Sequence, residues 1–267
     1  MSALARKRLL ESWYAKWNRR AFVHPDPLET LYPFRRRADR EIVGLIAAGL
    51  AFGGVRAILN SIATVTARLE PHPSTALRAL SRRELLSMFA AFRHRWVDGE
   101  HLASFLWAIR ETVRTYGSLE KAYTDDAVPV PNTPFPLLHR FVDRVCACGS
   151  TTPGPLLSDP AAGSACKRLH LYLRWMVRKD AVDPGGWSRV SPASLYVPLD
   201  THMHRMALDL GLTRRKQANA KTVCEVTEAF GRIRPDDPVR YDFVLTRFGI
   251  RRARERDAFI RQFRGDA

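Results

Sequence analysis

Apolar residues recur mostly at intervals of three and four along this chain, and runs in which polar and apolar residues alternate are scarce. The first spacing is typical of amphipathic helices and the second of strands. The pattern therefore predicts an all-α fold. The expected helices are Ala3–Arg20, Asp39–Gly49 continuing through Val55–Leu69, Arg82–Ala91, His101–Thr115, Pro136–Cys146, Ser164–Arg178, Thr201–Leu210, Ala220–Phe230 and Arg240–Phe248.

Two segments interrupt the helical pattern. Tyr123–Phe135 contains three prolines, and Lys179–Pro198 contains prolines and two adjacent glycines. Neither can be one continuous helix, because proline lacks the amide hydrogen that a helix interior needs, and both are expected to be surface connections. In contrast, Ile42–Ala51 is apolar almost throughout. This predicts a helix buried on most sides at the centre of a helical domain.

The charge balance favours a polyanionic partner. Lys and Arg number 43 against 27 Asp and Glu, which gives a formal net charge of +16 over 267 residues. Nucleic acid is the leading candidate, although charge alone does not choose between DNA and RNA, and acidic lipid is the alternative. The densest basic clusters are Arg35–Arg37, Arg214–Lys216 and Arg251–Arg256. Each is either a set of phosphate contacts or an ordinary solvated face.

Cysteine and histidine usage argues against a metal or cofactor, and we expect neither. Four cysteines are too few and too irregularly spaced for a disulfide scaffold or an iron–sulfur cluster. His202 and His204 lie two apart on an expected helix, so their side chains diverge and joint metal ligation is not expected. The chain has neither an apolar signal sequence nor an uninterrupted apolar stretch of about 18 residues, so we expect a cytoplasmic protein.

One segment carries the most specific signal for function. It reads P-L-D-T-H-M-H-R-M-A-L-D-L-G-L from Pro198 to Leu212, with Asp200 as a natural helix N-cap and Gly211 as a natural helix stop. This string resembles a segment of the helix-hairpin-helix DNA glycosylases, in which the aspartate both caps a helix and serves catalysis. The resemblance implies that Asp200 is the catalytic carboxylate. Such a group would stabilise the positive charge that builds on the sugar as a base leaves.

A second segment resembles the hairpin of the same superfamily. The bifunctional members carry G-x-G-x-K before the second helix of the motif, and here Gly163 and Lys167 match while Ala165 stands at the middle glycine. The resemblance implies that Lys167 is the nucleophile. A lysine in the first turn of a helix, partly buried, is biased towards the neutral amine that can attack the sugar and form a Schiff base. Lys179 is the alternative lysine.

The resemblance also implies which residues contact DNA and the excised base. The DNA contacts expected on the hairpin and on the helix after Asp200 are Gly163, Ser164, Ala165, Arg168, His202 and Arg205. A base pocket needs a stacking surface and polar groups, and its candidates are Phe52, Trp187 and Asp242. Core packing is the alternative role of the two aromatic residues, and helix capping that of Asp242.

Taken together, the chain looks like a bacterial branch of the endonuclease III and 8-oxoguanine glycosylase superfamily. We expect two helical subdomains, residues 41–179 with the hairpin and residues 1–40 plus 180–267, with double-stranded DNA in the cleft between them. The expected protein is a monomeric, nucleoid-associated DNA repair glycosylase with AP lyase activity, acting on an oxidised purine such as 8-oxoguanine. The alternatives are a monofunctional glycosylase, in which Asp200 activates water, and a non-catalytic helical protein that binds nucleic acid.

Overall fold

The computed structural model of the chain describes residues 2–126, 133–152, 154–251 and 253–265. Among these residues are thirteen α-helices and one two-stranded antiparallel sheet, so the all-α expectation is confirmed. The helices are α1 (Ala3–Trp17), α2 (Arg37–Leu50), α3 (Val55–Ala67), α4 (Pro73–Ala79), α5 (Arg82–Met88), α6 (Gly99–Tyr116), α7 (Leu119–Thr124), α8 (Pro136–Gly149), α9 (Lys167–Val177), α10 (Thr201–Asp209), α11 (Ala220–Ile233), α12 (Asp242–Arg251) and α13 (Ala253–Arg264), and the strands are β1 (Arg93–His94) and β2 (Val97–Asp98).

The expected helices differ from the observed ones by a few residues at their ends, and two of the differences have an identifiable backbone cause. The helix predicted to continue from Asp39 to Leu69 is two helices, because the chain turns at Gly53, whose φ of +97° lies in the left-handed region. The helix predicted to begin at Ser164 begins at Lys167. Cys166 has a φ of +43°, in the left-handed region, and so cannot be part of a right-handed helix. The second difference makes Lys167 the first residue of α9.

Three α-helices and both strands were not predicted. The helices α4 and α7 have seven and six residues, too few to establish a helical period, and each strand of the hairpin has two. The helix α13 is dominated by charged residues and has an apolar stripe of only Phe259, Ile260 and Phe263. Short or highly charged elements depend on packing against their neighbours, which a periodic pattern does not record.

The two segments predicted to be surface loops, Tyr123–Phe135 and Lys179–Pro198, differ in how far the structure agrees with that prediction. In Tyr123–Phe135, Tyr123 belongs to α7, and residues 127–132 lie outside the described part of the chain. The segment Lys179–Pro198 contains no α-helix, as expected, but it is not a surface connection throughout. Val182, Asp183 and Trp187 are buried, because the segment folds back against α9 and α2.

Helix α2 occupies the centre of the hydrophobic core. Every residue from Glu41 to Leu50 is buried, which confirms the central buried helix expected from its sequence. Helix α9 packs directly on it, and a Cβ at Gly44 would lie 3.2 Å from a ring carbon of Tyr172. The absence of a side chain at Gly44 therefore permits the close approach of α2 to α9.

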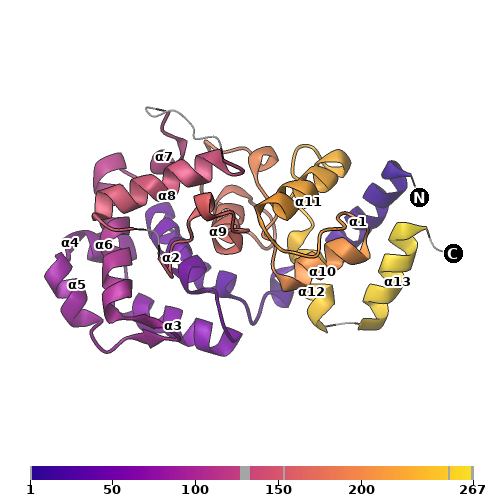
Figure 1. Cartoon of the computed structure of the whole chain (residues 1–267). Coiled ribbons are helices and arrows are strands. Elements are labelled where there is room, and N and C mark those ends of the chain that lie inside the picture. Colours follow the sequence, from indigo (N-terminus) through magenta and orange to yellow (C-terminus); the bar gives the residue numbers. More distant parts are fainter. Residues whose placement is uncertain (1, 127–132, 153, 252, 266–267) are drawn as a thin grey trace.

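The two helices α2 and α9 lie between two groups of helices in Figure 1. Helices α3 to α8 form one group, and the other contains α1 and α10 to α13, so that both chain ends lie in the same group. Helix α1 contacts α12, and Glu11 on α1 accepts a hydrogen bond at 2.7 Å from the hydroxyl of Tyr241, just before α12, and pairs with Arg240. The division into residues 41–179 and the two flanking segments stays a prediction.

The contact of α6 with α8 leaves no room for a methyl group at one point. A Cβ at Gly149 would lie 2.5 Å from the Cβ of Ala108, whereas a Cβ at Gly231 on α11 would meet nothing within 4 Å. We expect Gly149→Ala to lower the free energy of unfolding by about 1–3 kcal/mol through overpacking. Gly231→Ala is the control and should raise it by about 0.4–1 kcal/mol by restricting the unfolded chain. Denaturant titration measures both, and equal stability of the two variants would contradict the packing described.

Candidate active site

A cavity of about 290 Å³ lies at the meeting point of the central helices and the C-terminal group. Its walls come from the turn between α2 and α3, from α9, from the segment before α10 and from α12. Lys167, Asp200 and Asp242 all line it, together with Arg174 and Arg247. The three chemically distinctive residues of the sequence analysis therefore meet in one cavity, although they lie on three different elements.

Asp200 performs two roles through its two carboxylate oxygens. It is the N-cap of α10, where Oδ1 accepts a hydrogen bond from the amide of Met203 at 2.8 Å. Its Oδ2 lies 3.7 Å from Nζ of Lys167, and the side chains are 24% and 34% exposed respectively. The cap fixes the direction of the carboxylate, so that the free oxygen faces the lysine. Both groups remain accessible to a ligand that enters the cavity.

The turn before α9 determines where Lys167 lies. Gly163 has a φ of +72° and ends a 3-10 turn at Pro160–Ala162, and the Ser164 hydroxyl accepts a hydrogen bond from the Cys166 amide at 3.2 Å. The Gly163 carbonyl accepts a hydrogen bond from the Ala220 amide at 3.1 Å, which ties the turn to the start of α11. These restraints hold the first turn of α9, and with it Lys167, beside Asp200.

Asp242 is the buried acid of the cavity. Its side chain is the first of α12, is almost fully buried, and pairs through Oδ2 with the guanidinium of Arg174. The other oxygen, Oδ1, is buried without a hydrogen-bond partner. Burial raises the pKa of Asp242 to about 6, against the opposing effect of Arg174, and the negative charge of Asp200 adds to the rise.

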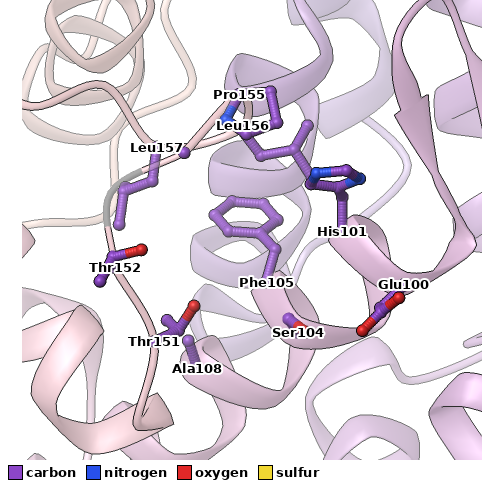
Figure 2. A pocket seen from close by; sticks show the side chains of 11 residues that line it. Glu100, His101, Ser104, Phe105, Ala108, Thr151, Thr152, Pro155, Leu156 and Leu157 are labelled. Carbon is purple, nitrogen blue, oxygen red and sulfur yellow. The ribbon is translucent and has the colours of Figure 1, made fainter.

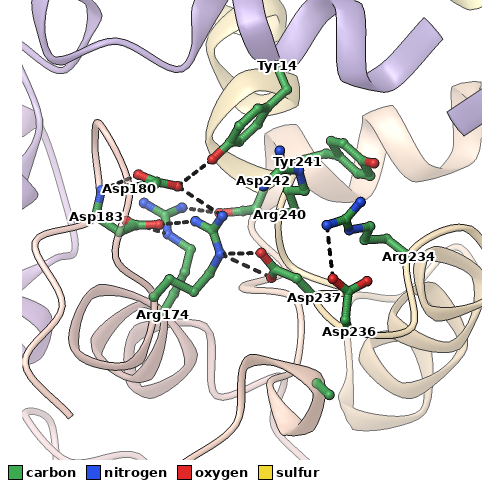
Figure 3. Close-up of polar contacts among 12 residues, drawn as sticks. Tyr14, Arg174, Asp180, Asp183, Arg234, Asp236, Asp237, Arg240, Tyr241 and Asp242 are labelled. Atoms are coloured by element: carbon green, nitrogen blue, oxygen red, sulfur yellow. Dashed lines mark hydrogen bonds and ion pairs between the residues drawn. The ribbon is translucent and has the colours of Figure 1, made fainter. Parts of the chain in front are cut away.

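Behind the cavity, a buried network of arginines and aspartates joins α9 to α12 and to the segment between α9 and α10 (Figure 3). Arg174 Nε donates to Asp183 Oδ1 at 3.2 Å, and Arg178 pairs with Asp183 and donates from Nε to Asp237 at 3.0 Å. The sequence analysis did not identify this network. The two arginines are four residues apart in the helix predicted over Ser164–Arg178, which places them on one face of that helix and was the available signal.

A family model described as "Protein of unknown function (DUF2400)" matches residues 26–251, which include Lys167, Asp200 and Asp242. This chain belongs to the DUF2400 family. No curated protein and no solved structure matches it. The DUF2400 match therefore covers the whole set of ionisable residues in the cavity without assigning a role to any of them.

The two aromatic candidates for the base pocket of this DUF2400 protein lie elsewhere. The expected place of Trp187 in the base pocket is corrected, because its ring is buried against those of Tyr123 and Tyr172 and does not line the cavity. Phe52 is outside the lining as well, but it directly follows Ala51 in the cavity wall. Its ring stacks on Trp96, with centroids 4.9 Å apart, and Trp96 is 62% exposed. Trp175 on α9 is a tryptophan that does line the cavity.

The residues expected to contact DNA divide into two sets. Gly163, Ser164, His202 and Arg205 are exposed, and Ala165 is half-buried. The guanidinium of Arg168, by contrast, donates to the Gly49 carbonyl and to the Ser158 hydroxyl and lies over the Phe52 ring. It joins the start of α9 to the end of α2, where the sequence predicted a phosphate contact. A phosphate would have to compete with these internal bonds.

The basic clusters are exposed but partly paired. The side chains of Arg35–Arg37 and Arg214–Lys216 reach solvent, and Arg37 pairs with Glu120 while Arg215 pairs with Glu225. In Arg251–Arg256, Arg256 pairs with Asp209, and Arg252 and the neighbouring side chains of 251 and 254 lie outside the described residues. The Arg215–Glu225 pair is exposed on both sides and contributes little to stability, whereas Arg37 pairs with the buried Glu120.

Three further cavities lined by described residues contain neither a lysine nor an aspartate. A cavity of about 400 Å³ between α6 and the loop after α8 is lined by Glu100, His101 and Phe105 from α6 and by Leu156 and Leu157 from the loop (Figure 2). Its histidine is held by Asp98 at 2.7 Å, and no lysine lines it. Within the described residues, no group of three His, Cys, Asp or Glu side chains could hold a metal, and no helix has the length and apolar character to cross a membrane.

The cap formed by Asp200 allows its structural and chemical roles to be separated. Asp200→Ala should lower the free energy of unfolding by about 1 kcal/mol, because α10 loses its N-cap, whereas Asp200→Asn should cost much less because the amide oxygen still accepts from Met203. Denaturant titration measures both. The matched control is Asp98→Ala, which removes the same kind of cap from α6 outside this cavity. Equal stability of Asp200→Ala and Asp200→Asn would mean that the cap is unimportant.

Proposed function

We propose that this protein is a DNA glycosylase with AP lyase activity, related in mechanism to the helix-hairpin-helix glycosylases. The observation that carries the proposal is the 3.7 Å approach of Lys167 Nζ to Asp200 Oδ2 on the wall of a cavity. The two residues were singled out in separate sequence segments, each from its own resemblance to that superfamily. An amine and a carboxylate are the pair that this chemistry requires.

The reaction would proceed by displacement at the sugar. The neutral amine of Lys167 attacks C1′ of the damaged nucleotide, the N–C1′ bond forms, and the glycosidic bond breaks with departure of the base. Asp200 stabilises the positive charge that develops on the sugar and accepts a proton from the lysine nitrogen. Ring opening then gives a Schiff base between Lys167 and C1′, which permits elimination of the 3′-phosphate and cleavage of the strand.

The dimensions and charge of the protein fit a single extruded base. A cavity of about 290 Å³ is at the lower end of the volumes of small-ligand sites, about 300–1,000 Å³. A base must leave the duplex to reach such a cavity, and the cost of unstacking is offset by contacts made with the protein. Trp96 is exposed and stacks on Phe52 next to the cavity wall, so its ring offers a flat surface on which bases that stay in the duplex can stack.

Binding of double-stranded DNA is supported by charge and by exposed backbone donors. The net charge of +16 favours a polyanion, and the exposed turn at Gly163 and Ser164 precedes the N-terminus of α9, where amides bind phosphate oxygens. His202 and Arg205 are exposed on α10, directly after Asp200. We propose that the helix-hairpin-helix motif spans this turn, that the duplex lies in a cleft between the two groups of helices, and that the protein acts as a nucleoid-associated monomer.

The identity of the lesion is proposed from the sequence alone. The long interval between Lys167 and Asp200 and the absence of an iron–sulfur cysteine motif resemble the oxoguanine-type branches, so an oxidised purine is the preferred substrate. A monofunctional glycosylase is the second candidate. The ion pair favours it, because an amine engaged as the cation partner of Asp200 is not nucleophilic, and Asp200 would then activate water.

Borohydride trapping distinguishes the two candidates, because it fixes a Schiff base covalently to DNA. We expect wild-type protein to form a trapped adduct with a duplex containing 8-oxoguanine or another oxidised purine, and Lys167→Gln to form none. The adduct is measured by its shift on a denaturing gel.

Lys179→Gln is the matched control, because Lys179 is exposed just beyond the other end of α9 and does not line the cavity. Its adduct should equal that of wild type. If the adduct is lost in Lys179→Gln but not in Lys167→Gln, the nucleophile is Lys179 and our assignment of Lys167 is wrong. Release of the base without any adduct would identify the monofunctional enzyme.

A further inference from the structure

Asp242 is a cavity residue that the displacement reaction does not use. Its carboxylate lines the cavity beside Lys167 and Asp200, is 3% exposed, and has one oxygen without any hydrogen-bond partner. A buried polar atom of this kind costs stability unless a ligand or a proton satisfies it. The unpartnered oxygen therefore indicates a contact that is made only when the cavity is occupied.

The distribution of charge identifies Asp242 as the acid that holds a proton. Two buried arginines, Arg174 and Arg178, contact four carboxylates, those of Asp180, Asp183, Asp237 and Asp242, so full ionisation would leave more negative than positive charge in the network. Both arginines pair with Asp183, whereas Asp242 has only Arg174 and shares it with Asp183. Of the two carboxylates in this network that are almost fully buried, Asp183 and Asp242, Asp242 thus has the smaller compensation by positive charge.

The other charged groups around Asp242 do not change the conclusion that Asp242 is the acid that holds a proton. The groups that act on it or share its cavity are Arg174 and Lys167 from α9, Asp183 after α9, Asp200 at the start of α10, Arg247 from α12 and Asp26. Arg247 is already paired with Asp26, and Lys167 lies beside Asp200. Burial and the neighbouring Asp200 outweigh Arg174 and raise the pKa of Asp242 to about 6. The N-terminus of α12 favours the ionised form but does not offset burial.

We propose that Asp242 binds the excised base in its protonated form and donates a hydrogen bond from Oδ1 to an acceptor on the edge of that base, such as a carbonyl oxygen or a ring nitrogen. This inference rests on the proposed function, because the base is the ligand. Oδ2 remains bound to Arg174, which fixes the direction of the Oδ1 hydrogen. Binding of the base is therefore linked to uptake of one proton, and Asp242 selects bases that present an acceptor at this point.

The variant Asp242→Asn tests the proposal, because an amide donates a hydrogen bond at every pH while its oxygen can still accept from Arg174. We compare the apparent second-order rate constant for base release in Asp242→Asn and wild type between pH 5 and 8. Below pH 6 the two should be similar. Above pH 6 the ratio of Asp242→Asn to wild type should rise about tenfold per pH unit, because only the wild type loses its donor. Taking the ratio removes any pH dependence that the two proteins share.

Asp237→Asn is the matched control. Asp237 belongs to the same buried network through Arg178 but does not line the cavity, so its ratio to wild type should not change with pH. A ratio for Asp242→Asn that stays flat, or that falls as pH rises, would overturn the proposal. A falling ratio would mean that ionised Asp242 accepts a hydrogen bond from the base instead.

A second measurement tests the protonation of Asp242 independently of whether the protein is a glycosylase. The folded pKa of Asp242 lies about two units above the unfolded one, so between about pH 4 and pH 6 the carboxyl of the unfolded chain ionises while the buried one keeps its proton. Wild type therefore loses stability over this range, and Asp242→Asn does not. The unfolding constant of wild type relative to Asp242→Asn should rise about a hundredfold over this range. No rise would overturn the proton on Asp242. If the unfolding constant rises as expected but no base is released from any duplex, Asp242 does hold a proton, and the base is not its ligand.

Discussion

The ion pairs of Arg174 and Arg178 are the interactions on which the geometry of the cavity depends. They connect α9 with Asp183 in the following segment and with Asp237 and Asp242 near the start of α12. All of these partners are buried or nearly so, and removal of one partner from a buried pair typically costs about 3–5 kcal/mol because the other charge is left uncompensated. The network therefore holds the helix that carries Lys167 against the helix that carries Asp242.

The cavity combines one fixed side and one accessible side. The buried network and the close packing of α9 on α2 at Gly44 fix the first side, and Arg168 joins the start of α9 to the end of α2. On the accessible side, Lys167 and Asp200 are each partly exposed, with Asp200 directed by the cap that it makes for α10. Lys167 and Asp200 are thus positioned by packed elements and stay partly exposed in the cavity.

The sequence predicted those features that depend on local patterns. Most α-helices, the buried centre at α2 and the cap at Asp200 follow from apolar spacing and from residues typical of helix starts. Features that depend on tertiary contacts were missed or misplaced. Trp187 has the sequence context of a loop residue yet packs in the core, and the arginine–aspartate network joins charges that are far apart in the chain. The exposed stack of Trp96 on Phe52 requires the short hairpin, which leaves no alternating pattern to detect.

Release of a free base from damaged DNA tests the central claim most directly. Purified wild type and Asp200→Asn, which should retain the cap of α10, would be incubated in excess over duplexes that each contain one lesion, with an undamaged duplex as control. The account predicts that wild type releases a base from at least one lesion duplex and that Asp200→Asn does so at least about 100-fold more slowly. If wild type binds these duplexes but releases no base from any of them, the cavity is not a glycosylase active site and the protein is a nucleic-acid-binding one.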